Sequence, residues 1–324
     1  MKIGSSFSDW KHQEEGVPQE SIISVTLFII KINGISDEVK DPQMSSLFVD
    51  DFALIIRGKR LELMERHLQQ ALDKIQKWAL RNGFKFSIDK TVCIRFHLSN
   101  HQKWEPMKKP EFKIGPNTIK CKQEAKFLGL IFDRNLSFVP HILYLKKKCQ
   151  KARNLLKVVA HQHWGADKDT ILTLYRALVR SKLDYGSAVY GSARPSYLKK
   201  LEPIQNQALR LALGAFHTSP IPSLNALCSE PPLHIRRTKL ALSYSSKLLG
   251  HPDNPAYQHV FKTKYDKKYL EKESVIKPMS CRIAKHVADG KIPFDDRHVL
   301  PSVDLVFPPW ETPAINTDLE LSFL

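Results

Sequence analysis

The chain has 324 residues, 42% of them hydrophobic, with 50 Lys and Arg against 33 Asp and Glu, a formal net charge of +17. This composition excludes a disordered chain, because it supplies enough apolar side chains to bury real cores. The positive excess favours a polyanionic partner, nucleic acid first. The alternative interpretations are a solubility feature, or a ribosome-like or membrane-surface charge.

The five cysteines are scattered, with neither a C-x-x-C pair nor the Cys–His spacing of a zinc site. We therefore expect reduced thiols in an intracellular protein of the nucleus or the cytoplasm. The N-terminal residues lack the apolar core of a signal peptide, so secretion is not expected. No stretch approaches the length of about 18 apolar residues that a membrane helix needs.

The first predicted element is an apolar helix. Residues 1–20 are polar and turn-like, and Ser21 is placed to cap a helix that runs to about Val39. Polar residues interrupt its apolar stretch at Ser24, Thr26 and Lys31. A mostly buried helix is therefore favoured over a membrane span.

A tight hairpin is predicted next. The segments 47–49 and 52–56 are short, apolar and rich in β-branched or aromatic residues, as strands are. Asp50 and Asp51 lie between them. The pattern therefore predicts two carboxylates at the tip of a hairpin.

An amphipathic helix is predicted over 61–81, where apolar residues recur at steps of three and four and Asn82-Gly83 follows as a stop signal. Phe84, Phe86 and Ile88 then alternate with polar residues, and the alternation resumes over 92–98, which predicts strands. Another short apolar strand is predicted over 127–132. Together these elements indicate an α+β domain with an antiparallel sheet and packed helices.

Helical spacing replaces strand spacing beyond Pro140, so we place a domain boundary near residue 138. Between His141 and Leu213 there are fourteen Lys or Arg and four Asp or Glu. Such a run is often only a solvated helix face, but an imbalance this one-sided favours contact with nucleic acid. The region 251–324 lacks clear periodicity and is Pro-rich from Pro301, so it is expected to be irregular.

Two adjacent carboxylates on a rigid turn suit magnesium, which prefers hard oxygen ligands shared with substrate phosphates. The pair alone is a weak motif. Asp295-Asp296 has no second apolar strand behind it, and there a turn or cap is the better interpretation. The context of Asp50-Asp51 must decide.

Several segments, in order, resemble the reverse transcriptases of non-LTR, jockey-like LINE retrotransposons. Residues 16–28 read GVPQESIISVTLF, similar to the motif that opens the long palm helix, and Phe48-Val49-Asp50-Asp51 matches the [FY]-x-D-D turn. Residues 83–91 and 126–133 are similar to the following lysine motif and to the primer-grip hairpin. Short segments between 164 and 210 are similar to the thumb and connecting helices.

The resemblance implies RNA-directed DNA synthesis with two metal ions, Mg²⁺ or Mn²⁺, on an RNA template and a DNA primer with deoxynucleoside triphosphates. It leaves the oligomeric state open and implies no membrane partner. Residues 1–137 would form a partial palm, 138–250 a basic helical thumb and connecting region, and 251–324 the irregular remainder.

The resemblance also assigns roles to particular residues. Asp50 and Asp51 would be catalytic metal ligands, with Asp50 the more direct one, and Lys90 would give a proton or positive charge to the departing pyrophosphate. Residues beside the incoming nucleotide and template would be Gln19, Ser21 and Phe48. The primer grip would include Phe127, Leu128 and Gly129. Without the resemblance, a helix cap partner at Gln19, a solvated lysine and an ordinary core strand would be preferred.

The chain departs from the family pattern. We expect the first catalytic Asp strand and the fingers to be missing, because the chain begins close to Gly16, and Asp9 is no substitute. We also expect the chain to stop before any ribonuclease H domain. Glu20 stands where the family has glycine, and Val25 where it has proline. We therefore expect a fragment that is inactive alone, with a nucleic-acid-binding remnant as the alternative function and a remnant that does not fold stably as a third.

Overall fold

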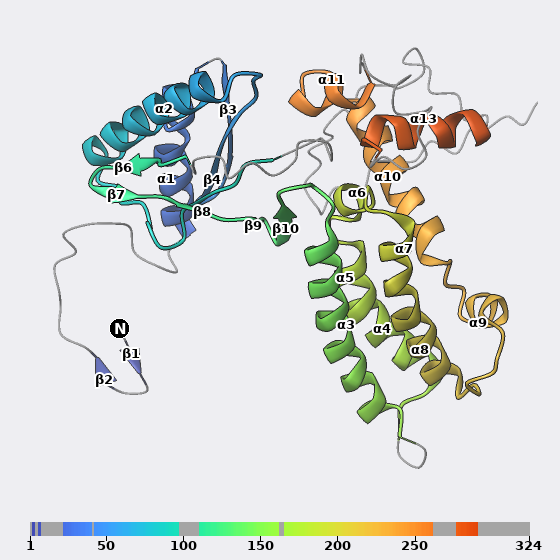
Figure 1. The fold of residues 1–324 in the computed structure, drawn as a ribbon. Helices are drawn as coiled ribbons and strands as arrows, with labels where there is room; N and C mark the ends of the chain where they lie inside the picture. Colours follow the sequence, from blue (N-terminus) through green and yellow to red (C-terminus); the bar gives the residue numbers. More distant parts are fainter. Residues whose placement is uncertain are drawn as a thin grey trace, which may run out of the picture. The chain divides into compact units, whose positions relative to one another are not determined.

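The computed structural model describes residues 2–3, 6–7, 22–40, 42–96, 110–161, 165–261 and 277–290. The chain divides into two compact units, Met1–His141 and Ile142–Leu324. The described part of the first unit mixes helices and strands, and that of the second is helical (Figure 1). Across these ranges no helix combines the length and apolarity that crossing a membrane requires.

The described strands of the first unit pair two by two. Four pairs are antiparallel: β1 (Lys2–Ile3) with β2 (Ser6–Phe7), β3 (Gln43–Phe48) with β4 (Asp51–Ile56), β6 (Lys113–Ile114) with β7 (Asn117–Thr118), and β9 (Glu124–Phe127) with β10 (Leu130–Asp133). β5 (Val92–Cys93) and β8 (Lys120–Cys121) pair in parallel. The mixed fold class is confirmed, whereas one antiparallel sheet is wrong for the described residues.

The long helix α2 (Leu61–Arg81) confirms the predicted amphipathic helix and organises the core of the first unit. Asn82 caps it, and Gly83 follows with φ 75°, the left-handed conformation that glycine adopts at little cost. On one side Trp78 and its neighbours pack with Ile32 and Ile35. A second cluster joins Leu68 and Leu72 of the helix to Phe112, Ile114 and Ile119 around β6 and β7.

Helix α1 (Ile22–Asn33) corrects two expectations. It ends at Asn33, before Gly34 and the short 3-10 helix η1 (Ser36–Glu38), and does not continue to Val39. It is also mostly exposed: Ile23 and Ile30 are 66% and 67% accessible. An apolar helix is buried only on the sides that pack against neighbouring elements. In α1, Ser24 and Ile32 are buried and Phe28 is partly buried.

The alternating residues after α2 do not form the predicted strand. Residues 84–87 have no strand ladder, 88–90 form a turn, and only Val92–Cys93 is β-structure in this stretch. Phe84 stacks on Trp78 with ring centroids 5.3 Å apart. Alternating apolar and polar residues thus indicate an extended segment with one face packed on the core. A strand also needs a neighbouring segment to which its backbone is hydrogen-bonded.

The second unit is a helical assembly whose core contains Tyr175, Tyr190 and Leu201. Its first helices confirm the helical spacing seen in the sequence. In chain order the elements are α3 (Val139–Val159), α4 (Lys168–Tyr175), the π-helical turn η2 (Arg176–Arg180), α5 (Ser181–Asp184), α6 (Ser187–Tyr190), α7 (Pro195–Leu198), the 3-10 turn η3 (Lys199–Leu201), α8 (Glu202–Leu213), α9 (Ile221–Leu227), α10 (Leu233–Leu249), α11 (Pro255–Phe261) and α13 (Met279–Gly290).

The expectation of an irregular region over 251–324 is wrong for two segments. Helices α11 and α13 occur there, and both pack against α10. Cys281 and Ile283 of α13 are buried. The seven residues of α11 are too few to show helical periodicity, and such a helix owes its stability to packing. The 12 residues of α13 are amphipathic, a signal that the sequence does carry. The Pro-rich tail from 301 lies outside the described residues.

Candidate active site

The β3–β4 hairpin carries the Asp50-Asp51 pair at its tip, as predicted. Phe48 and Asp51 are register partners, so Val49 and Asp50 form the whole turn. Asp50 therefore stands in the turn, while Asp51 is the first residue of β4. At the other end of the hairpin, the Gln43 side-chain amide donates to the His67 carbonyl oxygen of α2 at 2.9 Å. The hairpin is thus fixed to the long helix and its tip projects from it.

Val49 adopts a strained backbone. Its φ is 55°, in the left-handed region that disfavours L-residues and β-branched residues most of all. Such a conformation costs about 1–3 kcal/mol and persists only where surrounding structure imposes it. Here the six paired residues of each strand impose it. The turn therefore holds its two carboxylates in a defined position.

Asp50 and Asp51 are both exposed. Within the described ranges, no group of three or more His, Cys, Asp or Glu side chains gathers around them or elsewhere to enclose a metal ion. Two carboxylates are nevertheless a suitable donor set for Mg²⁺, which commonly takes one or two protein carboxylates and completes its shell with water and substrate phosphates. The hairpin can therefore offer one face of a magnesium site.

Lys90 lies in a turn, not at the edge of a strand. Its backbone N–H donates to the Ser87 carbonyl oxygen at 3.2 Å, and the Thr91 N–H and hydroxyl donate to the same oxygen. The Lys90 side chain is exposed. None of the ion pairs found among the described residues joins it to Asp50 or Asp51.

The residues expected beside the nucleotide divide into two groups. Phe48 is 60% exposed at the end of β3, next to the carboxylate turn, so an aromatic face is available there. Gln19 and Ser21 lie outside the described residues, as does Glu20. Val25, the second departure from the family motif, is 60% exposed on α1.

The segment expected to form the primer grip is a hairpin, which corrects the single strand predicted over 127–132. Phe127 and Leu130 pair across a two-residue turn of Leu128 and Gly129, with φ 44° and 79°. Two positive φ values are the signature of a type I′ turn, and glycine adopts a positive φ at little energetic cost. The continuous apolar run hid this turn because Leu128 is an unusual residue for it.

Buried Asp133 closes the loop after β10, a role that the sequence did not reveal. Its carboxylate accepts hydrogen bonds from the backbone N–H groups of Asn135, Ser137 and Phe138 and from the Ser137 hydroxyl. The Asp-x-Asn-x-Ser spacing, typical of side-chain-closed turns, was the available signal. Asp133 is therefore structural.

Only part of the basic excess of the second unit is free for a partner. Arg176 and Arg180 form ion pairs with Glu230, and Arg236 does so with Asp184. These pairs could not be predicted from the sequence, because their members are 50 or more residues apart. The lysines of α3 are different: Lys147, Lys148, Lys151 and Lys157 are exposed.

Comparison with known proteins identifies the relationship. Residues 3–132 match the family model described as reverse transcriptase (RNA-dependent DNA polymerase). The RNA-directed DNA polymerases from mobile element jockey are similar: that of Drosophila funebris is 25% identical over 255 residues and that of Drosophila melanogaster 24% over 253. These alignments cover 77% and 74% of this chain.

A retrovirus-related Pol polyprotein from the type-1 retrotransposable element R1 of Bradysia coprophila is 26% identical over 199 residues, which are 60% of this chain and 19% of the relative. This chain spans about a quarter of the jockey relatives, 27% and 26% of their lengths. No solved structure matches it. The comparisons confirm the predicted resemblance to non-LTR retrotransposon reverse transcriptases.

Proposed function

Because residues 3–132 of the chain match the family model of reverse transcriptases, we propose that it provides the Asp50-Asp51 turn of an RNA-directed DNA polymerase. The observation that carries this proposal is the β3–β4 hairpin, which presents both carboxylates exposed on a two-residue turn. Within the same proposal, residues 1–137 contribute to the palm and 138–250 to the thumb and connecting helices.

The reaction is template-directed phosphoryl transfer. The primer 3′-hydroxyl oxygen bonds to the α-phosphorus of a deoxynucleoside triphosphate, the bond to the bridging oxygen breaks, and pyrophosphate leaves. Asp50 and Asp51 would hold Mg²⁺ or Mn²⁺, which when bound supplies positive charge to the attacking and leaving oxygens. The exposed ammonium of Lys90 would stabilise the negative charge on the departing pyrophosphate.

Two further residue groups would position the substrates. The exposed ring of Phe48, with Gln19 and Ser21, would lie along the nucleotide and template, since an aromatic face suits a base or sugar. The β9–β10 turn, with Phe127, Leu128 and Gly129, would hold the primer end. A glycine at this turn leaves the backbone open to close approach by a sugar-phosphate chain.

The exposed lysines of α3 would bind the RNA–DNA backbone. Lys147, Lys148, Lys151 and Lys157 are at spacings of one, three and six residues along a helix and are free of the ion pairs that hold Arg176 and Arg180. Each lysine that neutralises a phosphate releases counterions, so log K should fall with log salt by about 0.7–0.9 per contact. Lys147→Gln with Lys151→Gln should reduce that slope by one to two.

Primer extension on an RNA template with Mg²⁺ and deoxynucleoside triphosphates tests the catalytic role. Any incorporation that the chain supports should be abolished by Asp50→Asn, and because the chain is expected to be inactive alone, Mn²⁺ binding is the deciding measurement. Asp73→Asn is the matched control, because Asp73 is an exposed carboxylate of α2. Binding of Mn²⁺, measured by electron paramagnetic resonance, should weaken in Asp50→Asn and Asp51→Asn and stay unchanged in Asp73→Asn. Mn²⁺ binding that is indifferent to both hairpin substitutions, or incorporation that persists in both variants, would contradict the proposal.

A further inference from the structure

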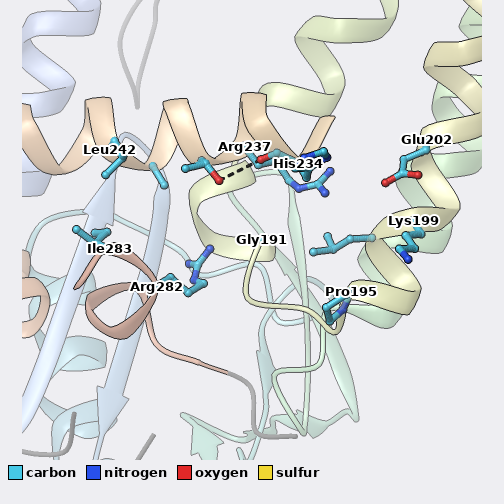
Figure 2. Close-up of a pocket in the computed structure, with 12 residues that line it drawn as sticks. Gly191, Pro195, Lys199, Glu202, His234, Arg237, Leu242, Arg282 and Ile283 are labelled. Atoms are coloured by element: carbon cyan, nitrogen blue, oxygen red, sulfur yellow. Dashed lines mark hydrogen bonds between the residues drawn. The ribbon is translucent and has the colours of Figure 1, made fainter. Parts of the chain in front are cut away.

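A cavity of about 270 Å³ lies in the second unit, remote in sequence from the carboxylate turn. It is bounded by α10, α13, the Gly191 loop and the segment where α7, η3 and α8 follow one another (Figure 2). Its charged and titratable lining side chains are Lys199, Glu202, His234, Arg237 and Arg282. The cavity is thus lined by three permanent cations and one carboxylate.

Arg282 is the most unusual of these residues. Figure 2 shows its side chain extending from α13 toward α10. One terminal nitrogen, Nη2, donates to the Ala188 carbonyl oxygen at 2.6 Å, but Nε is buried without a hydrogen-bond partner among the described residues. Burial lowers the pKa of Arg282 to about 10. The guanidinium is therefore largely withdrawn from water and only partly satisfied.

Gly191 permits this placement. A Cβ built on Gly191 would lie 2.5 Å from the Ser187 carbonyl oxygen and 2.9 Å from Nη1 of Arg282, both closer than real Cβ atoms approach a neighbour. The clash with the Ser187 oxygen alone requires glycine here, and the guanidinium of Arg282 then lies against the loop backbone. The Gly191 loop therefore contacts the guanidinium of Arg282, which extends from α13.

Arg237, from α10, is the second poorly compensated cation. Burial lowers its pKa, and Tyr190 and Glu202 act in the opposite direction. No carboxylate oxygen of the described residues comes within 4.0 Å of either Arg237 or Arg282. The same unit pairs Arg176, Arg180 and Arg236 at 2.6–2.8 Å. Arg237 and Arg282 therefore differ from these three paired arginines, whereas Arg153, Arg194 and Arg210 of the same unit also form no ion pair with a described residue.

Buried charges in proteins are normally paired, because withdrawing an ion from water costs several kcal/mol. Arg237 and Arg282 exceed Glu202 by one positive charge, and the exposed Lys199 of the lining adds a second. A phosphate dianion supplies two negative charges and oxygens that suit the planar donor fork of arginine. A phosphodiester or a carboxylate supplies only one charge.

We infer that this cavity is an anion site for a phosphate dianion, either free or as the terminal phosphate of a nucleic acid strand. Arg282 and Arg237 bind the phosphate oxygens within the cavity, and the exposed Lys199 completes the positive lining. The inference does not depend on the polymerase role, since it uses none of the residues of the β3–β4 hairpin.

Thermal unfolding of the full chain in inorganic phosphate, against chloride at matched ionic strength, tests the site. A ligand that binds only the folded state raises stability by RT ln(1 + [L]/Kd), so the midpoint should rise with the logarithm of phosphate concentration. Arg282→Gln and Arg237→Gln should each weaken phosphate binding by about tenfold or more, because each loses a charge-assisted hydrogen bond. Lys239→Gln, an exposed α10 residue outside the lining, should leave it unchanged.

The chloride arm reports folding separately. Arg282→Gln should melt cooperatively there, at a midpoint equal to or above that of the unsubstituted chain, because a buried uncompensated cation is removed. Oligonucleotides with a 5′-phosphate or a 5′-hydroxyl then identify the source. Tighter binding of the 5′-phosphorylated strand, lost in Arg282→Gln, assigns a strand terminus, and equal binding assigns free phosphate. The inference is overturned if phosphate raises the unfolding midpoint no more than chloride does at matched ionic strength. It is also overturned if the phosphate-dependent rise in midpoint is undiminished in both arginine variants.

Discussion

Arg180 and Glu230, fifty residues apart in the chain, form a bifurcated ion pair in the second unit. Nη1 of Arg180 donates to Oε1 and Oε2 of Glu230 at 2.8 and 2.9 Å, and Nε of Arg176 donates to Oε1 at 2.7 Å. The Glu230 side chain is 1% exposed. The pair connects the π-helical turn η2 to the loop that leads into α10.

Glu230→Gln should destabilise the second unit. The substitution keeps the shape but leaves two arginines facing a neutral amide, and removing one partner of a buried ion pair costs about 3–5 kcal/mol. Because Arg176 is 41% exposed and regains water, the loss should be near the lower figure. Urea unfolding measures it. Glu62→Gln, at an exposed position of α2, should change the midpoint little. Equal midpoints for the two variants would show that the pair contributes nothing.

Val49→Asn should stabilise the β3–β4 hairpin. Asparagine tolerates positive φ better than a β-branched residue, so up to about 1 kcal/mol of the strain should be relieved. Val158→Asn is the control, because Val158 is an exposed valine in helix α3. Valine and asparagine have similar helix propensities, so this substitution should change stability little. Chemical unfolding compares them. A midpoint that falls in Val49→Asn would mean that contacts of the valine outweigh its strain.

Ile30→Lys and Ile32→Lys should behave oppositely although both lie on α1. Ile30 is 67% exposed, so lysine there should change stability by about 0.5 kcal/mol or less. Ile32 is 9% exposed and packs in the cluster of Trp78, so a charge there should unfold the first unit. Circular dichroism of the two variants checks the difference. Destabilisation by Ile30→Lys as large as that by Ile32→Lys would show that the apolar face is covered.

Stability should decline at alkaline pH through Cys93. Burial, reinforced by neighbouring Cys121, raises its pKa from 9.0 to about 12. Between pH 9 and 12 the Cys93 thiol stays neutral in the folded state but ionises in the unfolded state. The stability that the neutral thiol contributes is therefore complete below pH 9 and is lost between pH 9 and 12. Between these limits the loss approaches about 1.4 kcal/mol per pH unit.

Unfolding midpoints of the unsubstituted chain and Cys93→Ala, followed from pH 8 to 10.5, check this sign. The unsubstituted chain should lose stability faster above pH 9, and the two curves should be parallel below it. Alkylation by iodoacetamide at pH 8 should also be slow at Cys93, because the thiolate is the reactive form. Rapid modification of Cys93 in the folded chain would contradict the raised pKa.

The sequence by itself determined the local features that depend on neighbours in the chain. The spacing of Met64, Leu68 and Leu72 predicted α2, and Asn82-Gly83 predicted its end, because both express helix geometry and backbone freedom over a few residues. Apolar segments on either side of Asp50-Asp51 predicted the hairpin and its two carboxylates. The ordered motifs also predicted the resemblance to non-LTR retrotransposon reverse transcriptases, which the comparisons confirmed.

Only the tertiary structure decided what depends on distant partners. The alternation at Phe84 and Phe86 marks a face against Trp78 with no strand partner, and the apolar helix α1 is exposed because few described elements cover it. The same holds for charge. Composition counts Arg176, Arg180 and Arg282 alike, yet the first two pair with Glu230, while no carboxylate of the described residues forms an ion pair with Arg282, because burial and pairing are set by residues far apart in the sequence.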